Sequence, residues 1–175
     1  MNSDSEKEKI ISATIELVTL ELKKPLWNQF RSDVQEEIKL KIQTAVSELF
    51  HLLPAYVLDK LSFGRHRFIF LNPFIDGYMI ELEPSLKTEF LIIINPCSYL
   101  EFSKDALIGI LVHELAHTFQ TGQYSQNQLK RYKQKEATVS DVIREWGLEK
   151  YVQTFFEERK EVQKSFLKGG NSQDQ

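Results

Sequence analysis

The chain has 175 residues, of which 42% are hydrophobic and 27% are charged, and its formal net charge is -3. A chain of this length normally folds as one domain whose core needs no disulfide or structural metal. The 22 basic and 25 acidic residues nearly balance, which argues against a nucleic-acid-binding protein because such proteins need a basic face. These values predict a single domain over residues 1–175.

The one cysteine, Cys97, excludes an internal disulfide, a cysteine-rich zinc site and a CxxC redox pair, and it favours a reducing compartment. The first nine residues lack the apolar run of a secretory signal. The longest apolar stretches, at residues 90–94 and 108–112, are too short to cross a bilayer. We therefore expect a cytoplasmic protein that does not associate with membranes.

Apolar residues at helical spacing predict two helices in the N-terminal part, residues 1–53. The first covers about residues 5–24, and the second runs from about residue 32 to residue 53. Ser32 is its expected N-cap, and Pro54 follows its end. An apolar stripe at this spacing is usually core, so the pair is expected to cover a sheet as a helical hairpin, with a surface for a protein partner as the alternative.

The middle of the chain changes to short segments rich in aromatic and β-branched residues. These segments predict three strands, at residues 66–71, 77–83 and 88–95. Turn residues between them, such as Asn72-Pro73 and Pro84-Ser85, predict that consecutive strands pair as an antiparallel meander.

Helices are predicted again after the strands. Ser103 is the expected N-cap of a helix over about residues 104–121. Two further helices, at about residues 134–146 and 148–167, are separated by a bend at Gly147. The expected parts of the domain are therefore a helical N-terminal part (1–53), a sheet and metal-site core (66–148), a C-terminal helix (149–167) and a disordered tail (168–175).

The first of these helices carries the motif HExxH. His113 and His117 lie four residues apart and so on one helical face, where two imidazoles can bind one zinc ion. Glu114 lies beside them, where a carboxylate can accept a proton from a metal-bound water. The motif predicts a hydrolase in which His113 and His117 bind Zn²⁺ and Glu114 is the general base.

Catalytic zinc usually takes three protein ligands. A metzincin would need Gly at position 120 and His at position 123, but the chain has Gln120 and Gln123, so that pattern is excluded. The two other histidines, His51 and His66, lie upstream on a predicted helix and a predicted strand, and we interpret both as structural.

The segment EATVSDVIREWGL, residues 136–148, resembles the glutamate helix of gluzincins, the thermolysin-like zinc peptidases, and most closely that of compact minigluzincins. The resemblance covers about residues 88–148. It implies a zincin-like α+β fold, with a small antiparallel or mixed sheet over the HExxH helix. It also implies peptidase activity, with Glu136 as the third zinc ligand.

One position departs from the family pattern. Gluzincins commonly have Asp four residues after the ligand Glu, where it orients the first histidine, but this chain has Ser140 there and Asp141 beside it. Groups in this position fix the imidazole tautomer, so Ser140 and Asp141 are the candidates for that role. If Glu136 were only a solvated charge, Asp141, Glu145 and Glu149 would be the fallback ligands.

A peptidase must also hold its substrate and stabilise the oxyanion. By residue type alone, the candidates for the oxyanion are Tyr124, Tyr132, Arg144 and Tyr151. The resemblance implies that an extended peptide is added to the third strand or to its neighbour.

The resulting prediction is a zinc-dependent metallopeptidase with a peptide or protein substrate and an open, shallow cleft. Two alternatives stay open. One is a zinc-binding regulatory or interaction protein without turnover that acts through the N-terminal helices. The other is a regulatory peptidase with one protein target, similar to the HExxH proteases that cleave phage repressors.

Overall fold

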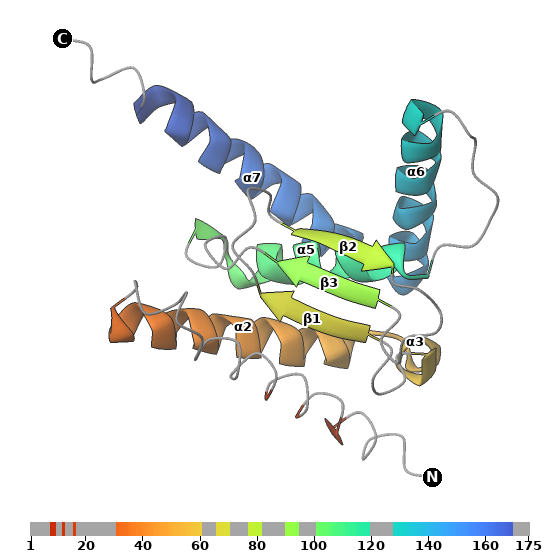
Figure 1. Cartoon of the computed structure of the whole chain (residues 1–175), viewed down its shortest axis with the longest axis horizontal. Helices are drawn as coiled ribbons and strands as arrows, with labels where there is room; N and C mark the ends of the chain where they lie inside the picture. The colour runs from red at the N-terminus through yellow and green to blue at the C-terminus, as the bar shows by residue number, and fades with distance from the viewer. Residues whose placement is uncertain are drawn as a thin grey trace.

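The computed structural model is shown in Figure 1. It describes Glu8, Lys9, Ser12, Glu16 and residues 31–60, 66–70, 77–81, 90–94, 101–119 and 128–169. Three predicted parts lie outside these ranges: most of the first helix, the turns between the strands, and the last six residues of the tail.

The long helices are α2 (Ser32–Leu52), α5 (Lys104–His117), α6 (Gln128–Trp146) and α7 (Glu149–Gly169), and the short helix α3 (Ala55–Lys60) follows α2. Ser103 is the N-cap of α5 as predicted, since its hydroxyl accepts a hydrogen bond from Ala106 N at 3.2 Å. The N-cap of α2 is Arg31, so the prediction of Ser32 is wrong by one residue. No helix in the described ranges is both long enough and apolar enough to span a bilayer.

Three short strands pair in the order β1 (His66–Phe70), β3 (Phe90–Ile94), β2 (Gly77–Glu81). β1 runs parallel to β3, and β2 runs antiparallel to it. The predicted antiparallel meander is therefore wrong, because β3 and not β2 is the central strand. The sequence of β3, FLIII, is continuously apolar, which is typical of a strand with a parallel partner. The turn residues between the segments do not encode this order.

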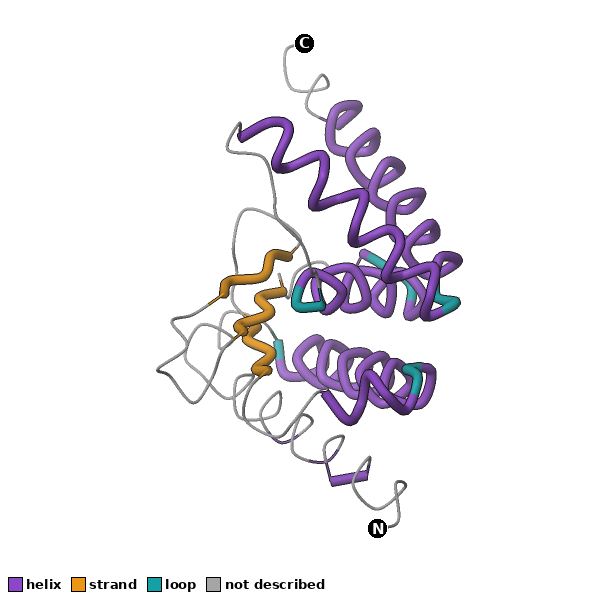
Figure 2. The backbone as a smooth tube through the Cα atoms, turned by 90° about the vertical axis from the view of Figure 1, so that its right-hand side faces the viewer, coloured by secondary structure: helices purple, strands orange, loops and turns teal. Residues whose placement is uncertain are grey.

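The predicted α+β fold class is wrong for the part of the chain that is described with its side chains. Of these residues, 89% are helical and none lies in a strand. Their hydrophobic core comes from helices and from residues that flank helices. The aromatic and β-branched segments that suggested a sheet provide three strands of five residues each, beside the stacked helices in Figure 2. The packing that is described is helix against helix.

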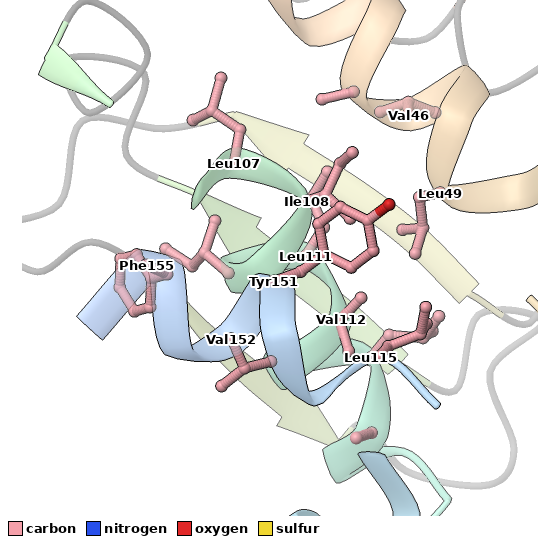
Figure 3. Packing of buried hydrophobic residues seen from close by; sticks show 14 of the residues in the cluster. Val46, Leu49, Leu107, Ile108, Leu111, Val112, Leu115, Tyr151, Val152 and Phe155 are labelled. Carbon is pink, nitrogen blue, oxygen red and sulfur yellow. The ribbon is translucent and has the colours of Figure 1, made fainter. Parts of the chain in front are cut away.

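Helix α5 is the centre of this core, with α2 and α7 packed against it (Figure 3). Its residues from Ala106 to Val112 are all buried, and so are Leu115 and Ala116. A helix that is apolar on nearly every side is normally buried on every side. The HExxH motif therefore lies on a helix that is packed against other parts of the protein on several sides.

Helix α7 lies very close to α5 at Gly109. A Cβ atom on this residue would lie 2.1 Å from the carbonyl oxygen of Tyr151 and 3.0 Å from the Cβ of Phe155. Real Cβ atoms do not come so close to backbone, so this approach requires glycine. The contact brings α7 alongside the helix that carries the two histidines.

A carboxylate of α7 also completes the N-terminus of α5. Glu158 accepts hydrogen bonds from Ser103 N at 2.8 Å and from Ser103 Oγ at 2.6 Å. Because unpaired N–H groups at a helix start are costly, Glu158→Ala is expected to lower the free energy of unfolding by about 1 to 2 kcal/mol. Urea denaturation measures this. The matched change Glu157→Ala, at an exposed neighbour, is expected to cost less than about 0.5 kcal/mol, and equal losses would contradict the capping role.

Candidate metal centre

The three predicted zinc ligands come together between α5 and α6. The rings of His113 and His117 have centroids 5.0 Å apart and planes at 86°. Glu136 Oε2 lies 3.6 Å from His113 Nε2, and Glu136 Oε1 lies 3.7 Å from His117 Nε2. One candidate ligand atom from each of the three residues lies within 4.8 Å of the other two. The side chains therefore converge on one point.

Local sequence explains why Glu136 reaches this point from α6. Val139, Ile143 and Trp146 are buried and lie four and three residues apart, so they form the apolar stripe by which α6 packs on the core. Glu136 lies three residues before Val139 and hence on the same side of the helix. Phe119, just after α5, packs edge to face on Trp146 with 5.2 Å between ring centroids, which fixes the C-terminal end of α6 against α5.

The donor set and its spacing fit a zinc ion. Two imidazole nitrogens and one glutamate oxygen are an established zinc ligand set, and they leave a fourth position open. Ligand atoms about 2.0 to 2.1 Å from a tetrahedral ion lie about 3.3 to 3.4 Å from each other, close to the distances observed here. The side chains of His113 and His117 are 15% exposed and that of Glu136 is 30% exposed. An ion held by them would be shielded by protein on one side and accessible on the other.

Glu114 is buried beside the three ligands, with 7% of its surface exposed. Burial, and secondarily the negative charge of Glu136, raises the pKa of Glu114 to about 8. A nearby cation would oppose this shift. A carboxyl group whose pKa lies near neutrality can both accept and release a proton under physiological conditions, as a general base must.

The ligands themselves have the protonation behaviour that a metal needs. Burial, followed by the charges of His117 and Arg159, lowers the pKa of His113 to about 4. The imidazole is therefore neutral at physiological pH, which is the form that binds metal. Burial raises the pKa of Glu136 in the ion-free site, so protons and the ion compete for this carboxylate.

Neither group predicted to orient a histidine is hydrogen-bonded to one. The Ser140 hydroxyl donates to the carbonyl oxygen of Glu136 at 3.0 Å, within α6. The carboxylate of Asp141 is exposed and accepts a hydrogen bond from Arg144 Nη1 at 2.9 Å. Both predicted partners are thus engaged with α6 itself.

The remaining fallback ligands, and the oxyanion candidates whose side chains are described, have other contacts. Glu145 accepts a hydrogen bond from the Tyr56 hydroxyl at 2.6 Å, and Glu149 lies 3.6 Å from the exposed guanidinium of Arg144. Tyr151 is buried in the core (Figure 3). Of the remaining predictions, Tyr124 and the side chain of Tyr132 lie outside the described residues.

Of the two histidines interpreted as structural, the side chain of His51 is described. His51 is exposed on α2, where its Nδ1 lies 2.7 Å from the carbonyl oxygen of Ser47. His66 begins β1.

Sequence reasoning missed two residues of α7 that border the centre. The ring of Phe156 packs edge to face on that of His113, with centroids 5.9 Å apart, and Arg159 is close enough to shift the pKa of His113. A groove of about 410 Å³ between α6 and α7 has Ile143, Val152 and Phe156 among its walls. One signal was present in the sequence, since Phe156 lies four residues after the buried Val152 and therefore on the same side of α7.

Comparison of the chain with protein-family models, with curated proteins and with solved structures found no match. The geometry of His113, His117 and Glu136, with Glu114 beside them, supports a metal centre with a proton acceptor.

Proposed function

We propose that the protein is a zinc-dependent metallopeptidase of the gluzincin type. The observation that carries the proposal is the convergence of His113, His117 and Glu136 on one point next to the buried Glu114. Zinc held by such a set acts as a Lewis acid that activates water near neutral pH. We propose a cytoplasmic location as well, supported by the single cysteine, Cys97.

In this proposal, Glu114 first accepts and then donates a proton. As general base, it accepts a proton from the attacking water, whose oxygen forms a bond to the carbon of the scissile carbonyl group. When the C–N bond breaks, Glu114 donates the proton to the leaving amine, so that one water yields one carboxyl group and one amine. The buried position of Glu114 supports this role because it keeps the pKa of the side chain within reach of both steps.

The sheet offers an edge for an extended substrate. Among the described strands, β3 has partners on both sides, whereas β2 pairs only with β3 and also contacts α5. Of the two strands considered for substrate addition, β3 is therefore enclosed and its neighbour β2 is the suitable one. A peptide paired with β2 would be held by main-chain hydrogen bonds alongside the helix that carries the HExxH motif.

One observation favours a zinc-binding regulatory or interaction protein without turnover. The contacts of Ser140 and Asp141 lie within α6, so the hydrogen bond that would orient a ligand histidine does not come from either. Loss of such a group typically costs about 10- to 100-fold in metal affinity or activity. A regulatory protein of this kind would have the same zinc site as the peptidase and would differ from it only in the absence of turnover.

Replacement of a ligand tests the zinc site common to both candidates. His113→Ala is expected to reduce zinc affinity by more than about 100-fold, because it removes a ligand and not merely a group that orients one. Metal analysis of the purified protein and the zinc-induced shift in thermal unfolding measure the effect. The matched variant His51→Ala, at an exposed histidine on α2, is expected to bind zinc as the wild type does. Equal zinc binding by both variants would exclude the site.

Turnover separates the two candidates. The zinc-loaded wild type is expected to cleave members of a peptide library, as detected by mass spectrometry of new termini. Zinc-loaded protein that cleaves no peptide would favour the regulatory candidate.

A further inference from the structure

The imidazole of His113 needs a fixed plane if it is to bind an ion. Helix α5 fixes the backbone of this residue, but the χ2 torsion of histidine has a broad energy profile, so the helix alone does not set the plane of the ring. In zinc sites, a hydrogen bond from a neighbouring group usually does so. Ser140 and Asp141, the groups predicted for this role, form their hydrogen bonds within α6. Packing against another ring would meet the same need.

Phe156 of α7 makes such a contact. Its ring packs edge to face on that of His113, with centroids 5.9 Å apart and planes at 83°. Aromatic pairs favour this arrangement at centroid distances of roughly 4.5 to 7 Å. The ring of His117 packs on His113 in the same manner, at 5.0 Å and 86°. Rotation of the His113 ring about χ2 would disturb its contacts with both neighbours, one on α5 and one on α7.

Phe156 is connected to the buried core through further rings. The centroid of its ring lies 5.3 Å from that of Phe155, which packs edge to face on Phe102 at 5.5 Å. Phe102 and Phe155 are each 3% exposed, and Phe155 belongs to the buried cluster in Figure 3. A continuous row of rings therefore leads from the core to the proposed zinc ligands, in the order Phe102, Phe155, Phe156, His113, His117.

Phe156 differs from the other phenylalanines of this row because 38% of its surface is exposed. It forms part of the wall of the groove between α6 and α7. A ring this exposed gains less from the hydrophobic effect than the buried ring of Phe155. Its removal also leaves no closed cavity in the core, so a variant at this position is expected to stay folded. The effect of the ring on His113 can therefore be measured in the folded protein.

We propose that Phe156 is a positioning residue of the zinc site, whose ring holds the imidazole of His113 in the orientation that binds the ion. Packing takes the place of the hydrogen bond that Ser140 and Asp141 do not form. A ligand that is already oriented loses less conformational freedom when the ion binds, so the ion is bound more tightly. This proposal rests on the zinc site of the proposed function and does not require turnover.

Zinc affinity, measured by competition with a chromophoric chelator, tests the proposal. Phe156→Ala is expected to weaken zinc binding by about 3- to 10-fold, the size of effect expected from the loss of one aromatic pair. The matched control is Leu40→Ala, which shortens a 65% exposed apolar side chain on α2 and is expected to bind zinc as the wild type does. Equal zinc affinity in the two variants would overturn the proposal.

Two further variants separate the ring from its apolar surface. Phe156→Tyr keeps the ring and is expected to bind zinc within about 2-fold of the wild type. Phe156→Leu keeps an apolar side chain without a ring and is expected to bind zinc less tightly than Phe156→Tyr. Circular dichroism and thermal unfolding of the zinc-free proteins establish that each variant is folded. Equal zinc affinity in Phe156→Leu and Phe156→Tyr would overturn a role for the ring.

A second measurement reports orientation directly and needs no metal. NMR relaxation of the imidazole carbon nuclei gives an order parameter for each histidine ring in the zinc-free protein. The order parameter of His113 is expected to fall in Phe156→Ala and to be kept in Phe156→Tyr, whereas that of His51, which is exposed on α2, stays unchanged in both. A general loss of stability would not produce this pattern. An unchanged order parameter of His113 in Phe156→Ala would contradict the positioning role.

These outcomes are distinct from those that test peptide hydrolysis. If the wild type binds zinc and cleaves peptides while Phe156→Ala keeps full zinc affinity, the role of Phe156 alone is overturned. If Phe156→Ala binds zinc more weakly but the wild type cleaves no peptide, the role of Phe156 is supported and the peptidase proposal is overturned. A wild-type protein that binds no zinc would overturn both.

Discussion

Glu114→Gln is expected to reduce kcat/KM for peptide hydrolysis by about 100- to 10,000-fold while zinc stays bound. The amide keeps the size of the carboxylate but cannot accept the proton of the attacking water. His113, His117 and Glu136 are unchanged, so metal analysis is expected to find wild-type zinc content. Cleavage of a library peptide, followed by mass spectrometry, measures the rate. The matched variant Glu101→Gln, at an exposed glutamate just before α5, is expected to keep full activity.

Glu114→Gln is also expected to change the stability of the zinc-free protein. Burial raises the pKa of Glu114 to about 8, so the folded protein holds a proton there that the unfolded chain releases above its ordinary pKa near 4.5. The contribution of Glu114 to the free energy of unfolding therefore falls as pH rises from about 4.5 to 8. Glu114→Gln lacks this dependence and is expected to be more stable at pH 7 by on the order of 2 kcal/mol.

Urea denaturation at a series of pH values, in the presence of a chelator, checks the stability prediction. The difference between Glu114→Gln and the wild type is expected to be small at pH 4 and to grow towards pH 8. A variant that is inactive but less stable at every pH would show that Glu114 acts through folding and not as a general base.

Gly109→Ala is expected to lower the free energy of unfolding by about 3 kcal/mol or more. The added methyl group would meet the carbonyl oxygen of Tyr151 at 2.1 Å, and backbone cannot yield as a flexible side chain can. Helix α7 must move away from α5 to accommodate it. Thermal and urea unfolding measure the loss.

Gly147 provides the matched control for this substitution. It has a φ of 70°, so alanine there is strained, but its Cβ would meet no atom within 4 Å. Gly147→Ala is expected to cost about 1 kcal/mol. Because Phe156 contacts His113, the displacement of α7 in Gly109→Ala is also expected to weaken zinc binding in the molecules that remain folded, whereas Gly147→Ala leaves it unchanged. Equal stability losses in the two variants would contradict the close approach at Gly109.

The parts of the centre that depend on spacing within a helix could be predicted from sequence. His113 and His117 are four residues apart on a helix that begins after Ser103, as predicted. The approach of Glu136 depends on the apolar stripe through Val139 and Ile143, which is likewise visible in the sequence. Zinc binding by His113, His117 and Glu136 remains a prediction, but the structure brings these three residues together.

The parts that depend on contacts between distant segments could not be predicted. Phe156 reaches the centre because α7 packs closely on α5 at Gly109, and helical periodicity does not encode where two helices meet. The central position of β3 depends equally on long-range pairing. The sequence predicted too large a role for the sheet. The aromatic and β-branched segments do have the composition of strands, but they make up a small share of a molecule whose described core is helical.

Three of the contacts of helix α7 fall within fewer than three turns, and each is with a different part of α5 or its N-cap. Tyr151 lies over Gly109, Phe156 packs on His113, and Glu158 binds Ser103. Because a helix turns by about 100° per residue, the insertion or deletion of one residue between Tyr151 and Glu158 would rotate the later contacts away from α5. Changes in the length of α7 can therefore be accommodated only near its C-terminal end, whereas exchanges on its exposed face leave all three contacts in place.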